Sequence, residues 1–237
     1  MPGFTSIASA WNTWLVAMKI ESPDKNLKDR ISRIREILVP LWPDAKPLLN
    51  YSSCFELLCS VVLSAQCTDE QVNAVTPALF RRYPSAAELA SAKLEDVEYI
   101  IHSVGFFHTK ARHLIMTSRI LSETYKGKVP RTMEELLTLP GVGRKTANLV
   151  SSACFGSPGL IIDTHVMRVA FRLGMYEKKD PAAIEDVLRA NVEEQFHTAL
   201  SHALNRHGKY LCTARAPACA REKGECPIES LCPKRGV

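Results

Sequence analysis

Residues 139–148, which read LPGVGRKTAN, join two segments with helical patterning at about 132–138 and 144–155. Two glycines one residue apart let the backbone adopt conformations closed to other residues, so a tight turn is expected there. The amides of residues 141–143 would then lie at the N-terminus of the second helix, where anions bind. The expected anion is a DNA phosphate, held without reading base sequence. An ordinary helix–helix corner is the plainer interpretation of the two glycines.

Lys145 stands out in this stretch because it falls in the first turn of the second helix. The helix dipole is unfavourable to a cation at that end, and Arg144 adds a like charge beside it. Both effects favour the neutral amine, which is the form that attacks carbon. The ordinary alternative is a solvated surface lysine, the commonest fate of this residue type.

Asp163 follows a short apolar run and precedes an amphipathic segment at about 166–173. Aspartate is a good N-cap, and capping is its ordinary structural role. A carboxylate held at this position also has the charge to stabilise a positively charged sugar in a transition state. If Asp163 lies close to Lys145, however, it favours the protonated amine, so the sequence leaves the charge state of the lysine open.

The composition is that of an ordinary globular protein, with 46% hydrophobic and 23% charged residues among 237. This length allows one domain or two small ones, and the net charge of +5 is compatible with polyanion binding. No stretch reaches the roughly 18 uncharged apolar residues of a membrane span. Residues 7–20 come nearest, but they lack the features of a signal peptide. We expect a cytoplasmic protein in which this segment is a docking helix or an extension without a role in the chemistry.

Apolar residues recur at helical spacing nearly throughout, for example at Leu94, Val97, Ile101 and Val104, with Gly105 where a C-terminal glycine belongs. The expected helix starts are Ser52 or Ser53, the capping boxes Thr68–Gln71, Ser85–Glu88 and Thr132–Glu135, and Asp180 before Pro181. No alternating strand pattern exceeds a few residues, and the chain has no internal repeat. The sequence therefore predicts an all-α protein.

The eight cysteines fall into two sets. Those in apolar helical segments, where a free cysteine behaves as a small hydrophobe, are Cys54, Cys59, Cys67 and Cys154. Those crowded into the last 26 residues are Cys212, Cys219, Cys226 and Cys232. Disulfides are the weaker interpretation for a chain in a reducing compartment, so the clustered set indicates a metal or iron–sulfur centre.

Taken together, these motifs carry a resemblance. LPGVGRKTAN, followed at this spacing by IDTHVMRV, resembles the helix-hairpin-helix DNA glycosylase superfamily, and within it the endonuclease III family. LLCSVVLSAQCTDEQVN (57–73), VGFFHTKA (104–111) and the cysteine-rich tail are similar to that family as well. The likeness covers about residues 26–232. A lysine paired with the aspartate further distinguishes the bifunctional members from the adenine-excising branch.

The resemblance implies two helical domains flanking a cleft. A six-helix domain at 46–157 would hold the helix-hairpin-helix at about 132–155. A second, discontinuous domain of residues 26–45 and 158–237 would hold an iron–sulfur cluster, and 1–25 would be an N-terminal extension. Lys145 and Asp163 would face each other across the cleft, with duplex DNA over its mouth.

The implied activity is base-excision repair by a monomer associated with the bacterial nucleoid. Lys145 would be the nucleophile and Asp163 the assisting carboxylate in removing oxidised pyrimidines such as thymine glycol, before β-elimination cuts the strand at the abasic site. Gln66 would enter the space left by the flipped base, and Phe106 would wedge the stack open, although core packing is an alternative for Phe106. The expected DNA contacts are Gln66, Phe106, Leu139, Gly141, Val142, Gly143, Arg144, His165 and Arg215. Glycosylases for mismatched thymine or ultraviolet dimers, and a non-catalytic DNA-binding module, are the alternatives.

The tail departs from the family pattern. Its spacing is C-x6-C-x6-C-x5-C, four residues longer between the middle pair than the family's C-x6-C-x2-C-x5-C. Cys212, Cys219, Cys226 and Cys232 are still expected to hold a four-iron, four-sulfur cluster if the insertion loops outward. Zinc is the rival, but four-cysteine zinc sites contain closely spaced pairs, and none exists here. Within residues 213–218 only Arg215 is basic, so Arg221 and Lys223 in the insertion are expected to supply a phosphate contact.

Overall fold

The computed structural model describes residues 27–43, 46–176, 180–221 and 224–237. Within these ranges the chain is helical and has no strand, which confirms the all-α prediction. The elements are α2 (Leu27–Leu41), α3 (Cys54–Leu63), α4 (Asp69–Arg82), α5 (Ala86–Ala90), α6 (Leu94–Ile101), α7 (Phe107–Thr124), α8 (Met133–Leu137), α9 (Arg144–Phe155), α10 (Thr164–Arg172), α11 (Pro181–Asn191), η1 (Glu194–Phe196), α12 (His197–Tyr210), α13 (Ala218–Arg221) and η2 (Glu229–Leu231). The predictions for residues 1–25 and for Lys223 lie outside the described residues. None of the helices described here is long and apolar enough to cross a membrane.

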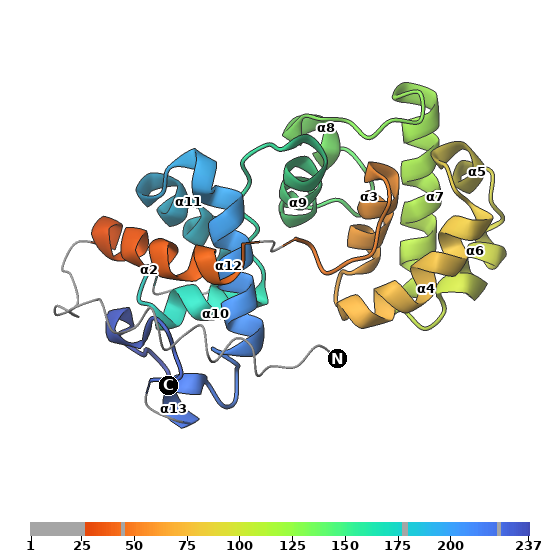
Figure 1. The fold of residues 1–237 in the computed structure, drawn as a ribbon. Helices are drawn as coiled ribbons and strands as arrows, with labels where there is room; N and C mark the ends of the chain where they lie inside the picture. Colours follow the sequence, from red (N-terminus) through yellow and green to blue (C-terminus); the bar gives the residue numbers. More distant parts are fainter. Residues whose placement is uncertain (1–26, 44–45, 177–179, 222–223) are drawn as a thin grey trace.

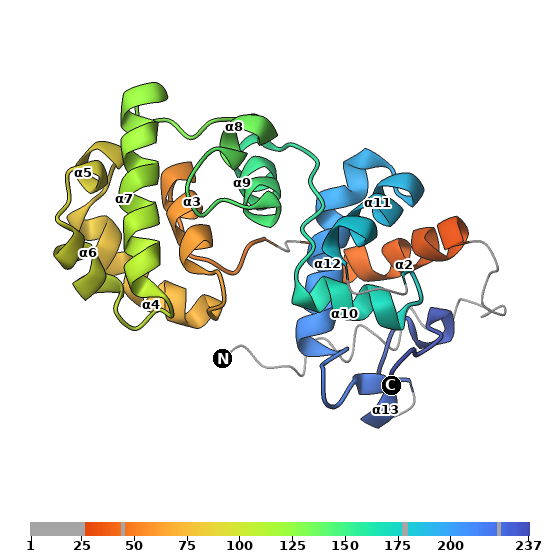
Figure 2. The ribbon, with the colours of Figure 1, turned by 180° about the vertical axis from the view of Figure 1, so that it is seen from behind.

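The helices form two groups, each around its own buried apolar core (Figure 1). Helices α3 to α9 surround one core, and α2 packs with α10, α11, α12 and the C-terminal segment around the other. The chain therefore passes from the second group to the first after α2 and returns after α9 (Figure 2). Lys145 and Asp163 lie on either side of that return, at the starts of α9 and α10.

Local capping chemistry sets several helix starts where the sequence predicts them. Ser53 caps α3, and Asp180 caps α11 with Pro181 in its first turn. Each of the three expected capping boxes is complete, with reciprocal bonds in Thr68–Gln71, Ser85–Glu88 and Thr132–Glu135. Each box satisfies amides that a helix start leaves without a partner inside the helix.

The turn after α6 corrects one expectation. Helix α6 ends at Ile101 with His102 as its C-cap, and the residue with a left-handed backbone is Phe106 (φ 59°), not Gly105. The turn runs close to the loop after α3. A Cβ on Gly105 would lie 3.6 Å from the Cys67 Sγ, an ordinary contact distance, so the approach of the two loops does not require glycine at 105.

The expectation that Cys54 and Cys154 are free is wrong. The two residues form a disulfide that joins the first turn of α3 to the last turn of α9, with a Cα–Cα distance of 5.6 Å. Cys59 remains a free thiol inside the core, where burial raises its pKa well above the usual value. Sequence did not reveal the pairing because the two cysteines meet only when α3 packs on α9.

Candidate active site

Two neighbouring helices, α3 and α7, contact the tight turn between α8 and α9. Gly141 has a left-handed backbone (φ +77°), and a Cβ there would lie 2.8 Å from the His113 Nδ1 and 3.2 Å from the Val62 Cγ1. The Thr117 hydroxyl of α7 also donates to the Pro140 carbonyl at 3.1 Å. Glycine is therefore required at 141 both for its conformation and for the space it leaves.

The side chains of the turn point in different directions. Leu139 and Val142 are 2% and 7% exposed and pack into the core, whereas Gly141, Gly143 and Arg144 are exposed. The expectation of three free amides is wrong for Val142, because its N–H donates to the Leu139 carbonyl at 3.1 Å and closes the turn. The amides of Gly141 and Gly143 make no backbone hydrogen bond within the described chain. Gly143 is also the N-cap of α9 and supplies no side-chain cap.

Lys145 projects from the first turn of α9 and is exposed to solvent. No acidic residue occupies that turn, and no ion pair between described residues involves Lys145. The Asp163 carboxylate therefore does not neutralise this amine through a direct ion pair. The amine lies beside the exposed turn at the start of α9.

Asp163 is held far more firmly than Lys145. It caps α10, as predicted, with its Oδ1 accepting from the Val166 amide at 2.8 Å. Its Oδ2 accepts from the side-chain amide of Asn205 in α12 at 2.6 Å. Both carboxylate oxygens are thus hydrogen-bonded, one to its own helix and one to another.

The segment between α9 and α10 is anchored on both sides. Asn148, buried in α9, donates to the Leu160 carbonyl at 3.0 Å. The amides of Gly159 and Ile161 donate to hydroxyls of α12 at 3.1 Å each, those of Thr198 and Ser201 respectively. These bonds fix the backbone that connects Lys145 to Asp163. Asn148 is the last residue of LPGVGRKTAN, and its neighbours at helical spacing include Lys145, Ser151 and Ser152, so the apolar pattern gave no signal of its role.

Gln66 and Phe106 lie in two adjacent turns and share an unusual backbone. Both are left-handed, with φ 56° and 59°, and both are exposed, Phe106 at 67%. This conformation costs a non-glycine residue about 1–3 kcal/mol and is characteristic of functional sites. Core packing, the alternative interpretation of Phe106, is excluded by its exposure.

Lys110, which the sequence analysis did not single out, stabilises the Gln66 turn. It is only 5% exposed, and its Nζ donates to the carbonyls of Leu63 and Ala65 at 2.8 and 2.7 Å. It also lies 3.2 Å from the Cys67 Sγ. A cation at the C-terminal carbonyls of a helix satisfies groups that the helix leaves unpaired. Its only signal was its place in the motif VGFFHTKA.

The environment around Asp163 includes two histidines. His165 is half-buried, and its Nδ1 lies 3.0 Å from the Arg168 Nη2. Burial, together with nearby Arg206, lowers the pKa of His202 to about 4 against the opposing effect of Asp163. His202 is therefore neutral at neutral pH and does not compete for the Asp163 carboxylate as a cation.

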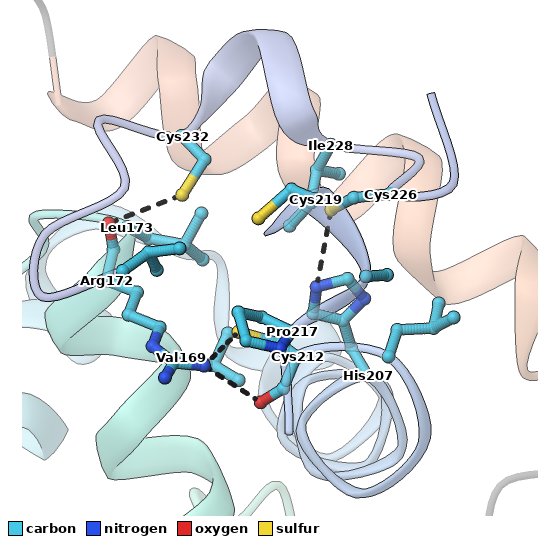
Figure 3. A pocket seen from close by; sticks show the side chains of 13 residues that line it. Val169, Arg172, Leu173, His207, Cys212, Pro217, Cys219, Cys226, Ile228 and Cys232 are labelled. Atoms are coloured by element: carbon cyan, nitrogen blue, oxygen red, sulfur yellow. Dashed lines mark hydrogen bonds between the residues drawn. The ribbon is translucent and has the colours of Figure 1, made fainter. Parts of the chain in front are cut away.

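The tail cysteines converge on one pocket beneath α10 and α12 (Figure 3). Burial raises the pKa of Cys226 to about 12 and also raises that of Cys232, and neighbouring tail thiols add to both shifts. Arg172, buried in α10, donates to the Thr213 carbonyl at 2.6 Å and lies 3.3 Å from the Cys212 Sγ. The structure therefore brings the predicted cysteines together despite the longer spacing.

The chemistry of the donor set bears on the two metal interpretations. Among the residues that the structure describes, no three His, Cys, Asp or Glu side chains are arranged to hold one metal ion. Four cysteine thiolates are the usual ligands of a four-iron, four-sulfur cluster. Zinc sites built from four cysteines usually contain pairs with about two to four residues between them, and the tail has no such pair. The four tail cysteines are therefore a donor set that suits a cluster.

Two arginines flank this pocket at the surface. Arg215 is exposed in a turn that the Thr213 hydroxyl closes by donating to the Ala216 carbonyl at 2.7 Å. Arg221 forms an exposed ion pair with Glu225 at 3.2 Å. A phosphate contact by Arg221 would have to compete with that carboxylate, whereas Arg215 has no such rival.

Comparison with known proteins identifies the family. Residues 59–194 match the family model described as HhH-GPD superfamily base excision DNA repair protein. An endonuclease III from Synechocystis sp. is 45% identical over 207 residues, covering 87% of this chain and 93% of the relative. The chain belongs to the endonuclease III family. The Escherichia coli endonuclease III is 42% identical over 184 residues, 78% of this chain and 85% of that protein.

Solved structures agree with this assignment. A trapped endonuclease III–DNA covalent intermediate is 38% identical, with a TM-score of 0.82, and the match covers 88% of this chain and 97% of that one. A thermostable thymine-DNA glycosylase has the same fold at 20% identity, with a TM-score of 0.77 and coverage of 87% and 96%. As a member of the endonuclease III family, the protein is a base-excision-repair DNA glycosylase with abasic-site lyase activity. The family is generally associated with a four-iron, four-sulfur cluster.

Proposed function

We propose that this enzyme uses Lys145 to remove oxidised pyrimidines such as thymine glycol from duplex DNA and then cuts the strand at the same nucleotide. The observation that carries the proposal is that two helix starts joined by one anchored segment present a lysine amine and a carboxylate. An unpaired lysine amine lies at the exposed start of α9, and a doubly hydrogen-bonded carboxylate lies at the start of α10. A solved endonuclease III trapped as a covalent intermediate with DNA supports a covalent reaction for this chain.

The chemistry runs in two stages. The neutral Lys145 amine attacks the sugar C1′, the glycosidic bond breaks, and the base leaves with the bonding electrons and takes up a proton. Transfer of one amine proton to the ring oxygen O4′ breaks the C1′–O4′ bond and opens the sugar, which leaves a protonated Schiff base between Nζ and C1′. Removal of a C2′ proton then expels the 3′ phosphate oxygen, so the strand breaks on the 3′ side. Hydrolysis of the Schiff base frees the lysine.

Asp163 would act on the charge that develops at the sugar. Cleavage of the glycosidic bond makes the sugar positively charged in the transition state, and a fixed carboxylate stabilises that charge without first having to reorganise. Its two hydrogen bonds provide this fixed orientation.

DNA would be held by the exposed turns of the first helical group. The free amides of Gly141 and Gly143 and the cation of Arg144 suit a phosphate. Gln66 and Phe106 suit a flipped base, because an apolar wedge offsets the few kcal/mol that extrusion costs. The two helical groups would act as two domains with the duplex lying across both, and the enzyme would work as a monomer.

The four tail cysteines would hold a four-iron, four-sulfur cluster, which when bound cross-links the C-terminal segment through its thiolates. The bound cluster would also order Arg172 and the turn that carries Arg215, which lie next to the cysteines. Purified protein should then be straw-brown with about four irons per chain. Iron should be lost from Cys226→Ser but kept by the matched variant Cys67→Ser, a cysteine outside the tail. A colourless protein containing zinc would contradict this assignment.

Borohydride trapping tests the proposed reaction. Reduction of a Schiff base on a duplex with one thymine glycol should give a covalent adduct with the wild type and with Lys128→Gln, a control at another exposed lysine. Lys145→Gln should give none. Trapping on an abasic site but not on thymine glycol would keep the lysine and overturn the substrate. An undiminished adduct from Lys145→Gln would overturn the nucleophile.

A further inference from the structure

The Asp163 carboxylate is contacted from another part of the chain by a residue that has no place in the reaction described above. Asn205 lies 42 positions along the sequence, in the third turn of α12, and its Nδ2 donates to the Asp163 Oδ2 at 2.6 Å. We propose that Asn205 is a positioning residue, which fixes the plane of the Asp163 carboxylate for attack at the sugar. This inference rests on the proposed role of Asp163.

The cap alone would not fix that plane. A carboxylate turns broadly about its last side-chain bond, because the rotation around an sp³–sp² bond has shallow minima. The capping bond to the Val166 amide holds Oδ1 only. A second bond at Oδ2, from a different helix, removes the remaining rotation. A carboxylate has about four acceptor positions, so each oxygen keeps a lone pair for the substrate.

The packing of α12 on α10 explains how Asn205 reaches Asp163. Gly208 lies one turn beyond Asn205 on the same face of α12. A Cβ at Gly208 would lie 2.9 Å from the His165 Cβ and 3.1 Å from the His165 carbonyl oxygen. The missing side chain lets the start of α10 come close enough to α12 for the side-chain hydrogen bond.

Asn205 is itself oriented by its neighbour. The Arg206 Nη1 donates to the Asn205 Oδ1 at 3.3 Å, while the Arg206 Nη2 donates to the Lys46 carbonyl at 2.5 Å. The amide oxygen of Asn205 therefore faces the guanidinium, and its NH₂ faces Asp163. This chain of contacts runs from the segment before α3 to the carboxylate, so it joins the two helical groups at the site.

Replacement of Asn205 by leucine keeps the size of the side chain and removes the donor. Hydrogen bonds to charged groups contribute enough that excision should slow by about 10- to 100-fold. Affinity for a duplex with a stable abasic analogue should not change, because neither Asn205 nor the Asp163 Oδ2 holds the phosphates. The longer amide in Asn205→Gln should restore part of the rate. Asn191→Leu, a matched control whose amide donates to the Val187 carbonyl in the same helix, should leave the rate unchanged.

A double-mutant cycle tests the proposal. Single-turnover excision is measured for wild type, Asn205→Leu, Asp163→Ser and the double variant, with thermal unfolding of each. Serine keeps a capping oxygen at 163 but removes the one that Asn205 contacts. The proposal expects Asn205→Leu to slow the wild type strongly and to change the Asp163→Ser variant by no more than about twofold.

Equal losses in both backgrounds, or a lowered unfolding temperature that accounts for the loss, would assign Asn205 a merely structural role and overturn the inference. If Asn205→Leu fails to fold, Asn205→Ala is placed in the same cycle and judged by the same criterion. An Asp163→Ser variant as fast as wild type would instead overturn the proposed role of Asp163, so the two failures are distinguishable.

Discussion

The starts of α9 and α10 carry the two groups to which we assign the reaction, yet they are built in opposite ways. The Lys145 side chain is free, and its position is set by backbone alone, through the glycine turn that packs on Val62 and His113. The Asp163 side chain is hydrogen-bonded at both oxygens by groups from α10 and α12. A nucleophile has to move toward carbon and back, whereas a charge that stabilises a transition state works best when it is already oriented. The different hydrogen bonding of the two side chains thus fits the different roles that we propose for them.

The largest effect is expected when the hydrogen-bonded Asp163 side chain loses its charge. Asp163→Asn keeps a capping oxygen for α10 but turns its NH₂ toward the NH₂ of Asn205, so the free energy of unfolding should fall by about 1–3 kcal/mol. Base excision should slow by about 10²- to 10³-fold, the usual cost of removing one preorganised electrostatic group. Single-turnover kinetics beside urea unfolding measures both. A rate within tenfold of wild type would mean that the carboxylate is only a cap.

The glycine turn that positions Lys145 should be destabilised by a substitution at Gly141 but hardly by one at Gly143. Gly141→Ala introduces a Cβ at φ +77° and 2.8 Å from His113, which should cost about 1–3 kcal/mol of stability and lower the fraction of active enzyme. At Gly143 φ is −96° and an added Cβ meets nothing, so Gly143→Ala should cost less than about 1 kcal/mol. Urea unfolding of the pair gives the comparison. Equal losses would show that the turn is not held by its contact with α7.

The smallest effect is expected at the exposed cation of the turn. Arg144→Gln should weaken DNA binding on any sequence and reduce the salt dependence of log Kd by about 0.9, the contribution of one phosphate. Fluorescence anisotropy over a range of salt concentrations measures this slope. Arg189→Gln is the matched control, since Arg189 pairs with Glu185 on α11, away from the hairpin. An unchanged slope for Arg144→Gln would remove Arg144 from the DNA interface.

What could be predicted from the sequence was local. The capping boxes, the Asp163 cap and the turn before Lys145 all depend on residues a few positions apart, and the structure has them as expected. The partners of the site were not predictable in this way. Lys110, Asn148 and Asn205 act on backbone or side chains that reach them only through helix packing.

Two expectations were wrong. The Cys54–Cys154 disulfide needs α3 beside α9, and neither cysteine differs in local pattern from Cys59, so short-range patterns could not reveal the pair. Gly105 resembled an ordinary helix end, but α6 already ends at Ile101, and the left-handed backbone falls at Phe106.

Locating the covalent bond between protein and DNA tests most directly whether Lys145 is the nucleophile. The borohydride-reduced adduct on a thymine glycol duplex is digested with nuclease and protease, and the modified peptide is sequenced by tandem mass spectrometry. We predict a sugar remnant on the Nζ of Lys145 and on no other amine. A remnant on a different lysine or on the N-terminal amine would show that another group is the nucleophile, and the roles assigned to α9 and α10 would then be wrong.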